Sequence, residues 1–382
     1  MVHAMWHVLA HGFEIHCQSA QLANAKPRSL ASCFILGPEL GPELGPEAGI
    51  GMSTRRYLLA DVGATHTRLA LAGPAGLQGQ AVRLATVDIV DGAGLLAAAK
   101  RWLDVRDLSG ACFALAGPVE HQIGALTNGA LCLDAADLTR QLGCPVKLVN
   151  DFCALALSLP MLQSLRQIGG HTSPALALSA EPSAEPSAEP SAEPSAVKVV
   201  IGPGSGLGMG ILIPESGGWR ALASEGGHGD LAPGSHLEME LLALLQAEHG
   251  HVSWESVLSG PGLVRLYRGV CALWGVRAET VTPEWISANG VDAAEPVCHQ
   301  TLEVFFGLLG GAAGNLALVL GAKGGVYIGG GIVPRLADFA AASPLRRRFE
   351  ERGPLSSYAA DIPLWIIMDP EPGLLGALEC LR

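Results

Sequence analysis

Apolar residues along the chain form short runs typical of strands and longer stretches with helical spacing. The runs predict strands over residues 57–61, 67–72, 112–116, 147–150, 197–201, 208–213 and 325–332. Apolar positions that recur every three or four residues predict helices over 94–103, 237–248, 264–273 and 301–320. Because a strand pair followed by alternating helices and strands occurs twice, the sequence predicts an α/β fold of two related lobes.

The longest apolar stretch, residues 304–322, contains 19 residues without a charge, which is long enough for a membrane-spanning helix. Gly307 and Gly311 within it have the spacing found where membrane helices pack together. It is nevertheless the only such stretch, Asn315 interrupts it, and small residues fill its centre. We therefore favour a helix buried in the α/β core over a membrane anchor, and we expect no membrane association.

Two segments of low complexity contrast with this pattern. Residues 37–48 repeat the letters GPEL or GPEA, and residues 180–195 are four copies of AEPS. Proline at every fourth position is incompatible with a regular helix or a strand ladder, so we expect residues 180–195 to be an inserted surface loop. We expect residues 1–51 to be a disordered tail or an extension ahead of an alternative start at Met52.

Composition narrows the class of protein further. The net charge of −12 argues against a nucleic-acid binder, which needs clustered lysine and arginine. The one basic run, residues 346–348, is expected to be a solvated helix face. Nine scattered cysteines without a C-x-x-C pair indicate a reducing cytoplasm rather than a disulfide scaffold, and they provide no structural zinc site.

Two glycine-rich turns carry the first candidate chemistry, and each joins two predicted strands. One is the segment DVGAT at residues 61–65, and the other is GPGSGLG at 202–208. No helix follows at once and the chain has no Gly-Lys dipeptide, which excludes a P-loop. Such glycines can aim backbone amides into a concavity that suits phosphate oxygens, with Thr65 and Ser205 adding hydroxyls and Asp61 holding a Mg²⁺ water. The alternative for either turn alone is an ordinary hairpin.

Polar residues at the ends of other apolar runs are candidates for the chemistry of an acceptor. Asp151 could take a proton from a hydroxyl and Asn150 could hold a neighbouring one. For this segment taken alone, a cap on the helix that follows would be the more common explanation. Glu225 and His228 flank two glycines, a pairing suited to sugar hydroxyls, whereas a lone histidine is more often structural or solvated. Glu255 on its own would pass as a surface glutamate.

Taken in order, these motifs resemble the bacterial glucokinases of the hexokinase/actin-type ATPase superfamily over residues 55–381, apart from the AEPS repeat. DVGATHTRLA and GPGSGLG are similar to the two phosphate motifs, and LVNDF is similar to the segment that bears the catalytic aspartate. SEGGH and HVSWESVLSGPGLVRLYR resemble sugar-side motifs, and GGVYIGGGIVPRL resembles the adenosine motif. Six motifs in the right order are far more specific than any one of them.

The resemblance implies a cytoplasmic kinase that uses ATP and Mg²⁺ to phosphorylate D-glucose at its 6-hydroxyl. It implies that Asp151 is the general base and that four residues bind the other hydroxyls, namely Asn150, Glu225, His228 and Glu255. It implies a nucleotide site, with Asp61 facing the metal through water, at Asp61, Gly63, Ala64, Thr65, Gly204, Ser205, Gly206, Gly329, Gly330 and Gly331.

The resemblance also implies a two-lobed actin-like (ribonuclease H-like) fold with an active-site cleft between the lobes. The small lobe would contain residues 52–161 and 373–382, and the large lobe residues 162–372. The sequence departs from the family at Ala64, His66 and Leu131, which replace glycine, asparagine and tryptophan, and the Ala64 methyl is expected to restrict the first turn. A kinase for another hexose, a non-catalytic sugar or nucleotide sensor, another phosphoryl donor and a homodimer remain open.

Overall fold

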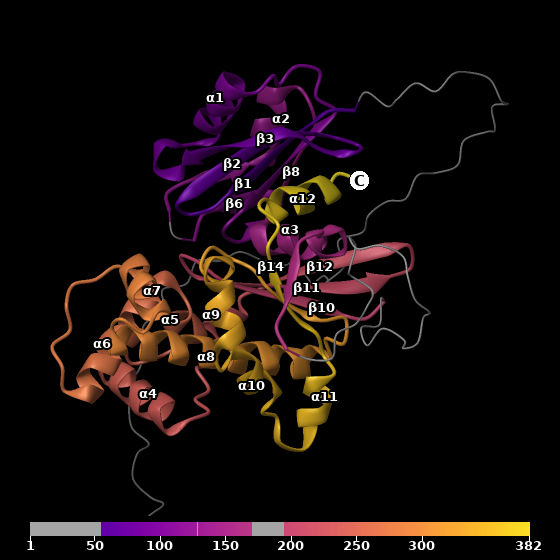
Figure 1. The fold of residues 1–382 in the computed structure, drawn as a ribbon. Coiled ribbons are helices and arrows are strands. Elements are labelled where there is room, and N and C mark those ends of the chain that lie inside the picture. The colour runs from indigo at the N-terminus through magenta and orange to yellow at the C-terminus, as the bar shows by residue number, and fades with distance from the viewer. Residues whose placement is uncertain (1–54, 128, 170–194) are drawn as a thin grey trace, which may run out of the picture. The chain divides into compact units, whose positions relative to one another are not determined.

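The computed structural model describes residues 55–127, 129–169 and 195–382, and both the N-terminal extension and the AEPS repeat lie outside these ranges. Two larger sheets and the helices that cover them make up the described chain (Figure 1). The α-helices are α1 (Gly92–Trp102), α2 (Ala135–Leu142), α3 (Asp151–Ser158), α4 (His236–His249), α5 (Trp254–Val257), α6 (Gly260–Trp274), α7 (Pro283–Val291), α8 (Pro296–Leu320), α9 (Ala337–Ala342), α10 (Leu345–Glu350), α11 (Ser356–Ala360) and α12 (Pro372–Glu379). Short 3₁₀ helices are η1 (Thr86–Asp88), η2 (Leu159–Met161), η4 (Gly226–His228), η5 (Val333–Leu336) and η6 (Gly353–Leu355).

The N-terminal sheet has the strand order β3-β2-β1-β4-β8. Its strands are β1 (Tyr57–Val62), β2 (His66–Gly73), β3 (Gly76–Ala85), β4 (Gly110–Leu115) and β8 (Val146–Asn150). A small antiparallel sheet beside it contains β5 (Val119–Glu120), β6 (Ile123–Ala125) and β7 (Cys132–Asp134). Strands β1, β4 and β8 are parallel, whereas β2 and β3 are antiparallel to their neighbours.

The C-terminal sheet has the order β12-β11-β10-β13-β14-β9. Its strands are β9 (Leu165–Gln167), β10 (Lys198–Pro203), β11 (Leu207–Glu215), β12 (Gly218–Ser224), β13 (Val326–Ile328) and β14 (Leu364–Ile367). As in the N-terminal sheet, an antiparallel three-strand meander continues into two further strands parallel to its first strand. The predicted repetition of one α/β scheme is therefore confirmed.

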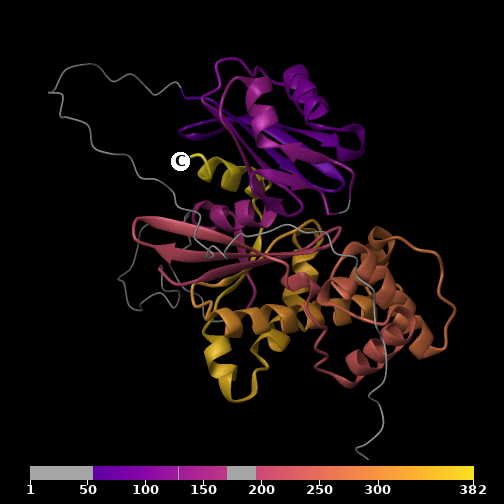
Figure 2. The ribbon, with the colours of Figure 1, turned by 180° about the vertical axis from the view of Figure 1, so that it is seen from behind.

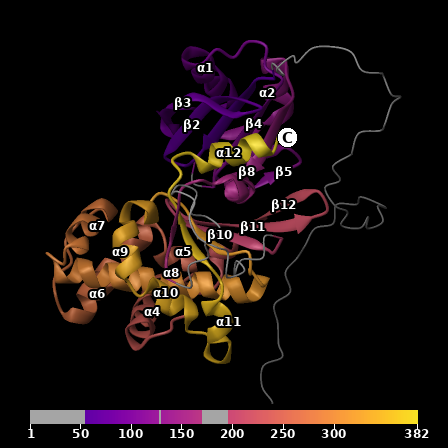
Figure 3. The ribbon, with the colours of Figure 1, turned by 45° about the vertical axis from the view of Figure 1, so that its right-hand side comes forward.

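Alternation along β1 decides what each face of the N-terminal sheet contacts. Leu58 and Ala60 join the apolar cluster of α1 and α2, whereas Tyr57 and Leu59 pack against residues of α12. Figure 3 shows α12, in yellow, beside the strands of this sheet. Because side chains in a strand alternate with a period of two, Asp61 faces the same side as Tyr57 and Leu59. The candidate acid thus points toward α12.

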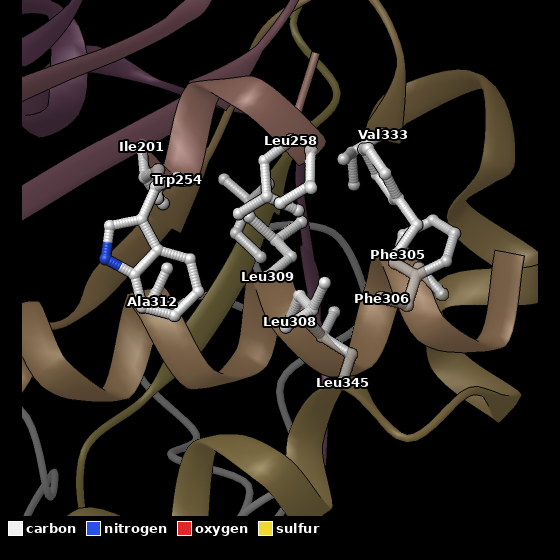
Figure 4. Packing of buried hydrophobic residues seen from close by; sticks show 14 of the residues in the cluster. Ile201, Trp254, Leu258, Phe305, Phe306, Leu308, Leu309, Ala312, Val333 and Leu345 are labelled. Carbon is white, nitrogen blue, oxygen red and sulfur yellow. The ribbon is translucent and has the colours of Figure 1, made fainter. Parts of the chain in front are cut away.

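The C-terminal sheet is also covered on both faces. Val199 and Ile201 belong to the cluster that α8 builds, and α8 lies along this sheet in Figures 1 and 2. In Figure 4, Phe305 and Phe306 of α8 lie in the same cluster as Trp254. On the opposite face, Val200 and Leu212 pack against residues of α3. Helix α3, which begins at Asp151, is therefore anchored on this sheet.

The apolar stretch flagged in the sequence lies in α8, which is long and apolar enough to cross a membrane. Most of its most apolar window, 72%, is nevertheless buried inside the protein. Gly310 and Gly314 face the backbone of α10 and its flanking residues so closely that a side chain on either would not fit. The prediction of a buried core helix is confirmed.

Two expectations from the sequence are wrong. The run at residues 346–348 is not a solvated face, because Arg346 and Arg348 are only 11% and 8% exposed. Arg348 forms a buried ion pair with Glu238 at 3.1 Å between Nη2 and Oε2, so its buried charge has a partner of opposite charge. The strand predicted over residues 325–332 is only Val326–Ile328, because Gly330 adopts a φ of 82° that ends the extended segment.

Candidate active site

Asp61 lies at the carboxyl end of β1 and is held by an arginine on the next strand. The β1–β2 register places Asp61 opposite Arg68, whose Nη1 donates a hydrogen bond to Oδ2 of Asp61 at 2.8 Å. Burial raises the pKa of Asp61, and the positive charge of Arg68 opposes that rise. Oδ1 of Asp61 accepts no hydrogen bond from the described residues. One oxygen of this carboxylate thus remains available to a ligand.

The first glycine turn, residues 63–65, is braced from below. The amide of Gly63 donates to the carbonyl of His66 at 3.0 Å, and Oγ1 of Thr86 donates to the carbonyl of Gly63 at 2.7 Å. Within the described ranges, the amides of Ala64 and Thr65 have no protein acceptor. From the sequence, the Ala64 methyl is expected to restrict this turn. Ala64 is not among the described non-glycine residues with positive φ, so its methyl causes no backbone strain there. Two backbone donors are free here.

The second glycine turn, between β10 and β11, is closed by its own backbone. The amide of Gly204 donates to the carbonyl of Gly206 at 2.8 Å, and the amide of Gly260 donates to the carbonyl of Gly204 at 2.8 Å. Ser205 at the tip is exposed, and its hydroxyl forms no hydrogen bond with the described residues. The predicted glycine-rich turn is therefore present, with Ser205 at its apex, and phosphate binding there stays a prediction.

Glu255 connects this turn to the predicted sugar-side residues. Its Oε2 accepts a hydrogen bond from the amide of Leu207 at 2.8 Å, and a Cβ on Gly206 would lie only 2.5 Å from the same oxygen. Its Oε1 lies 4.0 Å from Nε2 of His228. Glu225, at the start of the same short helix as His228, is exposed. The structure brings together Glu255, His228 and the second turn.

Asp151 begins α3, directly after β8. Burial raises its pKa to about 7, and the negative charges of Asp61 and Glu225 add to that rise. The amide of Phe152 donates to its Oδ1 at 3.0 Å. A carboxylate with a pKa near neutral pH suits a general base, because it is both ionised and able to take a proton. Asp151 therefore lies close enough to both Asp61 and Glu225 for their charges to act on it.

Asn150 acts as the N-cap of α3, which was the alternative left open by the sequence. Its Oδ1 accepts from the amides of Phe152 and Cys153 at 3.0 and 3.1 Å. Its Nδ2 donates to the carbonyl of Gly117 and to Oδ1 of Asp151, both at 3.2 Å. The capping interpretation is confirmed, and Asn150 also holds Asp151 in place. A contact between Asn150 and a sugar remains a prediction.

Phe152 is a site residue that sequence reasoning missed. A Cβ on Gly202 would lie 2.8 Å from Cζ of Phe152, and side chains on Gly208 and Gly210 would overlap the Phe152 ring and carbonyl. Glycines two positions apart on β11 leave one face of that strand bare, and Phe152 fills it. This spacing was the available signal. Phe152 anchors the residue after Asp151 on the hairpin that carries the second turn.

The third glycine segment, residues 329–331, follows β13, which pairs with β10. A side chain on Gly330 would meet the carbonyl oxygen of Pro203 at the end of β10. A Cβ on Gly331 would have nothing within 4 Å. The predicted adenosine segment thus lies against the base of the second glycine turn and has open space at Gly331.

The fold superimposes on those of solved sugar kinases. The structure of a glucokinase from an Antarctic psychrotroph superimposes with a TM-score of 0.70 at 31% identity, covering 86% of this chain and 99% of that one. A ROK-family glucokinase from Streptomyces griseus, solved with glucose and AMPPNP, shares only the fold, with a TM-score of 0.56 at 16% identity over 85% of this chain and 98% of that one. The class is therefore an α/β sugar kinase.

Sequence comparison narrows this class. The family model described as Glucokinase matches residues 58–382. A relative named Glucokinase from Chromobacterium violaceum is 41% identical over 322 residues, which cover 84% of this chain and 87% of the relative. The chain belongs to the glucokinase family, as its motifs indicated.

Proposed function

We propose that this protein transfers the γ-phosphoryl group of ATP to the 6-hydroxyl of D-glucose. The observation that carries the proposal is Asp151, whose pKa is raised to about 7 by burial and by the charges of Asp61 and Glu225. In phosphoryl transfer the protein mainly positions the reactants and neutralises charge, so one well-placed base suffices. Family membership supports the same reaction.

On the sugar side, Asp151 would accept the proton of the reacting hydroxyl. Glu225, His228 and Glu255 would bind the remaining hydroxyls, since carboxylates accept and an imidazole N–H donates hydrogen bonds. Glu255 holds the Leu207 amide with one oxygen, which leaves Oε1 facing His228. Asn150 would act mainly through Asp151, because its amide group already has four protein partners.

On the nucleotide side, the free amides of Ala64 and Thr65 and the hydroxyl of Ser205 would bind phosphate oxygens. Gly204 and Gly331 border open space, since a Cβ on either would touch nothing within 4 Å. Gly329 and Gly330 would line the adenosine part of the site. We expect the backbone dipoles of both turns to stabilise the negative charge that develops on the phosphoryl group during transfer.

The residues fit a magnesium ion that is held chiefly by phosphates and water. The described chain contains no group of three or more His, Cys, Asp or Glu side chains able to hold a metal. Asp61 offers one carboxylate oxygen without a protein donor among the described residues. This suits Mg²⁺, which usually keeps several waters and takes few protein ligands. When bound, the ion would neutralise charge on the transferred phosphoryl group.

The division into a small lobe (52–161 and 373–382) and a large lobe (162–372), with the active site in a cleft between them, belongs to the same proposal. The two similar sheets and the packing of α12 against the N-terminal sheet support it. A cytoplasmic location is part of the proposal as well, because glucose phosphorylation in this way consumes intracellular ATP.

The test is a coupled assay of the purified protein with a panel of hexoses and phosphoryl donors in the presence of Mg²⁺. We expect glucose 6-phosphate from glucose and ATP, with a kcat/KM for glucose well above that for mannose or glucosamine. A higher kcat/KM for another hexose would reassign the substrate. Binding of glucose and ATP without product would favour the sensor instead.

A further inference from the structure

Arg68 has no role in the proposed chemistry, yet it joins two carboxylates from opposite ends of the chain. Its Nη1 lies 2.8 Å from Oδ2 of Asp61, and its Nε lies 3.1 Å from Oε2 of Glu371. The side chains of Asp61 and Glu371 are only 18% and 29% exposed. An arginine fork held by two half-buried carboxylates has a fixed orientation, unlike an exposed ion pair.

The contact between Arg68 and Asp61 fixes one oxygen and leaves the other open. The two residues are direct partners across the β1–β2 ladder, so their side chains start from neighbouring backbone positions on one face. The hydrogen bond occupies Oδ2 of Asp61. The planar guanidinium thereby sets the plane of the carboxylate, which a flexible lysine would do less well.

Glu371 lies where helix α12 begins, but its side chain does not cap that helix. Its carboxylate contacts Arg68 instead. Two residues later, a Cβ on Gly373 would lie 3.1 Å from Cγ of Asp61, so the first turn of α12 closes around the same carboxylate. The start of α12 therefore confines Asp61 through a charge and through close packing.

A like charge explains why Arg68 needs a second partner. Arg83 on β3 is the direct cross-strand neighbour of Arg68, and like charges in such positions repel. The negative charge of Glu371, whose Oε2 lies 3.1 Å from Nε of Arg68, offsets this repulsion. Without it, Arg68 would lose the partner that holds its Nε and would be freer to leave Asp61.

We propose that Arg68 and Glu371 are positioning residues that act through Asp61: Glu371 holds Arg68, and Arg68 aims the open oxygen of Asp61 at the metal-bound nucleotide. The inference rests on the proposed function for the identity of that ligand. It extends the site to the C-terminal helix, which none of the sugar-kinase motifs includes.

The test compares Glu371→Gln with Glu379→Gln, which removes a charge from the other end of the same helix. Glu379 pairs with Arg382 at 3.1 Å, far along α12 from Asp61. Isothermal titration calorimetry measures binding of a non-hydrolysable ATP analogue with Mg²⁺, and steady-state kinetics give kcat and KM. We expect Glu371→Gln to weaken nucleotide binding or lower kcat by about 10-fold, as loss of a ligand's supporting partner does, with KM for glucose within about 2-fold. Glu379→Gln should match the wild type.

Arg68 provides the second arm. We expect Arg68→Met to weaken nucleotide binding or lower kcat by up to about 100-fold. Arg68→Lys should recover part of this loss, since lysine keeps the charge but not the planar guanidinium. Adding Glu371→Gln to Arg68→Met should reduce nucleotide binding or kcat little further, because the two residues act through one chain of contacts. Additive losses in the double variant would contradict that chain.

The inference is overturned if Glu371→Gln binds the nucleotide and turns over like the wild type. It is also overturned if the loss is matched by an equal rise in KM for glucose and a fall in Tm, which a general structural defect would produce. Binding of the Mg²⁺ complex without glucose phosphorylation would refute the proposed function alone, and the binding comparison would still decide this inference. No binding by the wild type would refute both.

Discussion

Replacing Asp151 by asparagine removes the charge that the proposed chemistry needs while keeping the shape of the site. The Phe152 amide can still donate to Oδ1 of the new side chain, and the contact with Asn150 is retained. Glucose and nucleotide binding should therefore survive. We expect kcat to fall by roughly 10²–10⁴, the usual contribution of a general base.

The pKa of Asp151 gives the variant a second, opposite effect on stability. Its carboxyl has a pKa of about 7 in the fold against an ordinary 3.8, so ionising it there costs up to about 4 kcal/mol. The folded state holds the proton more tightly than the unfolded chain, so the contribution of Asp151 to stability is present below pH 3.8 and is lost as the pH rises to about 7. Residual solvent contact reduces the net value to about 2–4 kcal/mol.

Two measurements check this reasoning. In the wild type, kcat/KM should rise with pH up to about 7 and then level off, since the base must be ionised. Urea unfolding should show that Asp151→Asn is more stable than the wild type at pH 8 and nearly equal to it at pH 4. The matched control is Asp134→Asn, an exposed N-cap of α2 that binds backbone amides in a similar way.

An Asp151→Asn variant with wild-type kcat would refute the assignment of the base. A variant that loses kcat but gains no stability at pH 8 would instead refute the burial argument. The control should change neither quantity by more than a small amount, because Asp134 keeps its amide contacts as asparagine.

Two further substitutions test packing and the first turn. Gly376→Ala should lower the free energy of unfolding in urea by about 1–3 kcal/mol, because the added methyl would overlap the carbonyl of Ala154 where α12 crosses α3. The control is Gly218→Ala, which borders open space and should lower it by less than about 1 kcal/mol. Ala64→Gly should leave KM for ATP within about 3-fold, since Ala64 has no positive φ to relieve, and a larger improvement would show that the methyl does obstruct the nucleotide.

The sequence predicted seven of the fourteen described strands and both glycine-rich turns, because these features depend on local patterns. Short apolar runs predicted β1 and β2, and the glycine-rich turn between them required no knowledge of the rest of the chain. The order of motifs then selected Asp151 among many acidic residues as the predicted base, which stays a prediction. These local predictions were correct for β1 and β2, whereas the strand predicted over residues 325–332 was too long.

Features that depend on distant segments were not accessible in this way. Arg348 lies in a run of three arginines that looks solvated, and only the packing of α10 against α4 and α8 supplies the buried partner Glu238. The pair formed by Arg68 and Glu371 likewise joins the second strand to the last helix. Neither residue stands out in a local window, because each gains its meaning from a contact that only the finished fold creates.

The predicted site residues likewise depend on two different sheets. Asp61 and the first turn depend on the N-terminal sheet, whereas the second turn and Glu255 depend on the C-terminal sheet. Helix α3 contacts both systems, since Phe152 fills the bare face of β11 while Ala154 touches the backbone of α12. Asp151 is the first residue of that helix, so we expect a change in the packing of α3 on either side to displace the proposed base. Substitutions at the glycines that pack against α3, such as Gly208 and Gly376, should therefore lower kcat even though these residues contact no substrate.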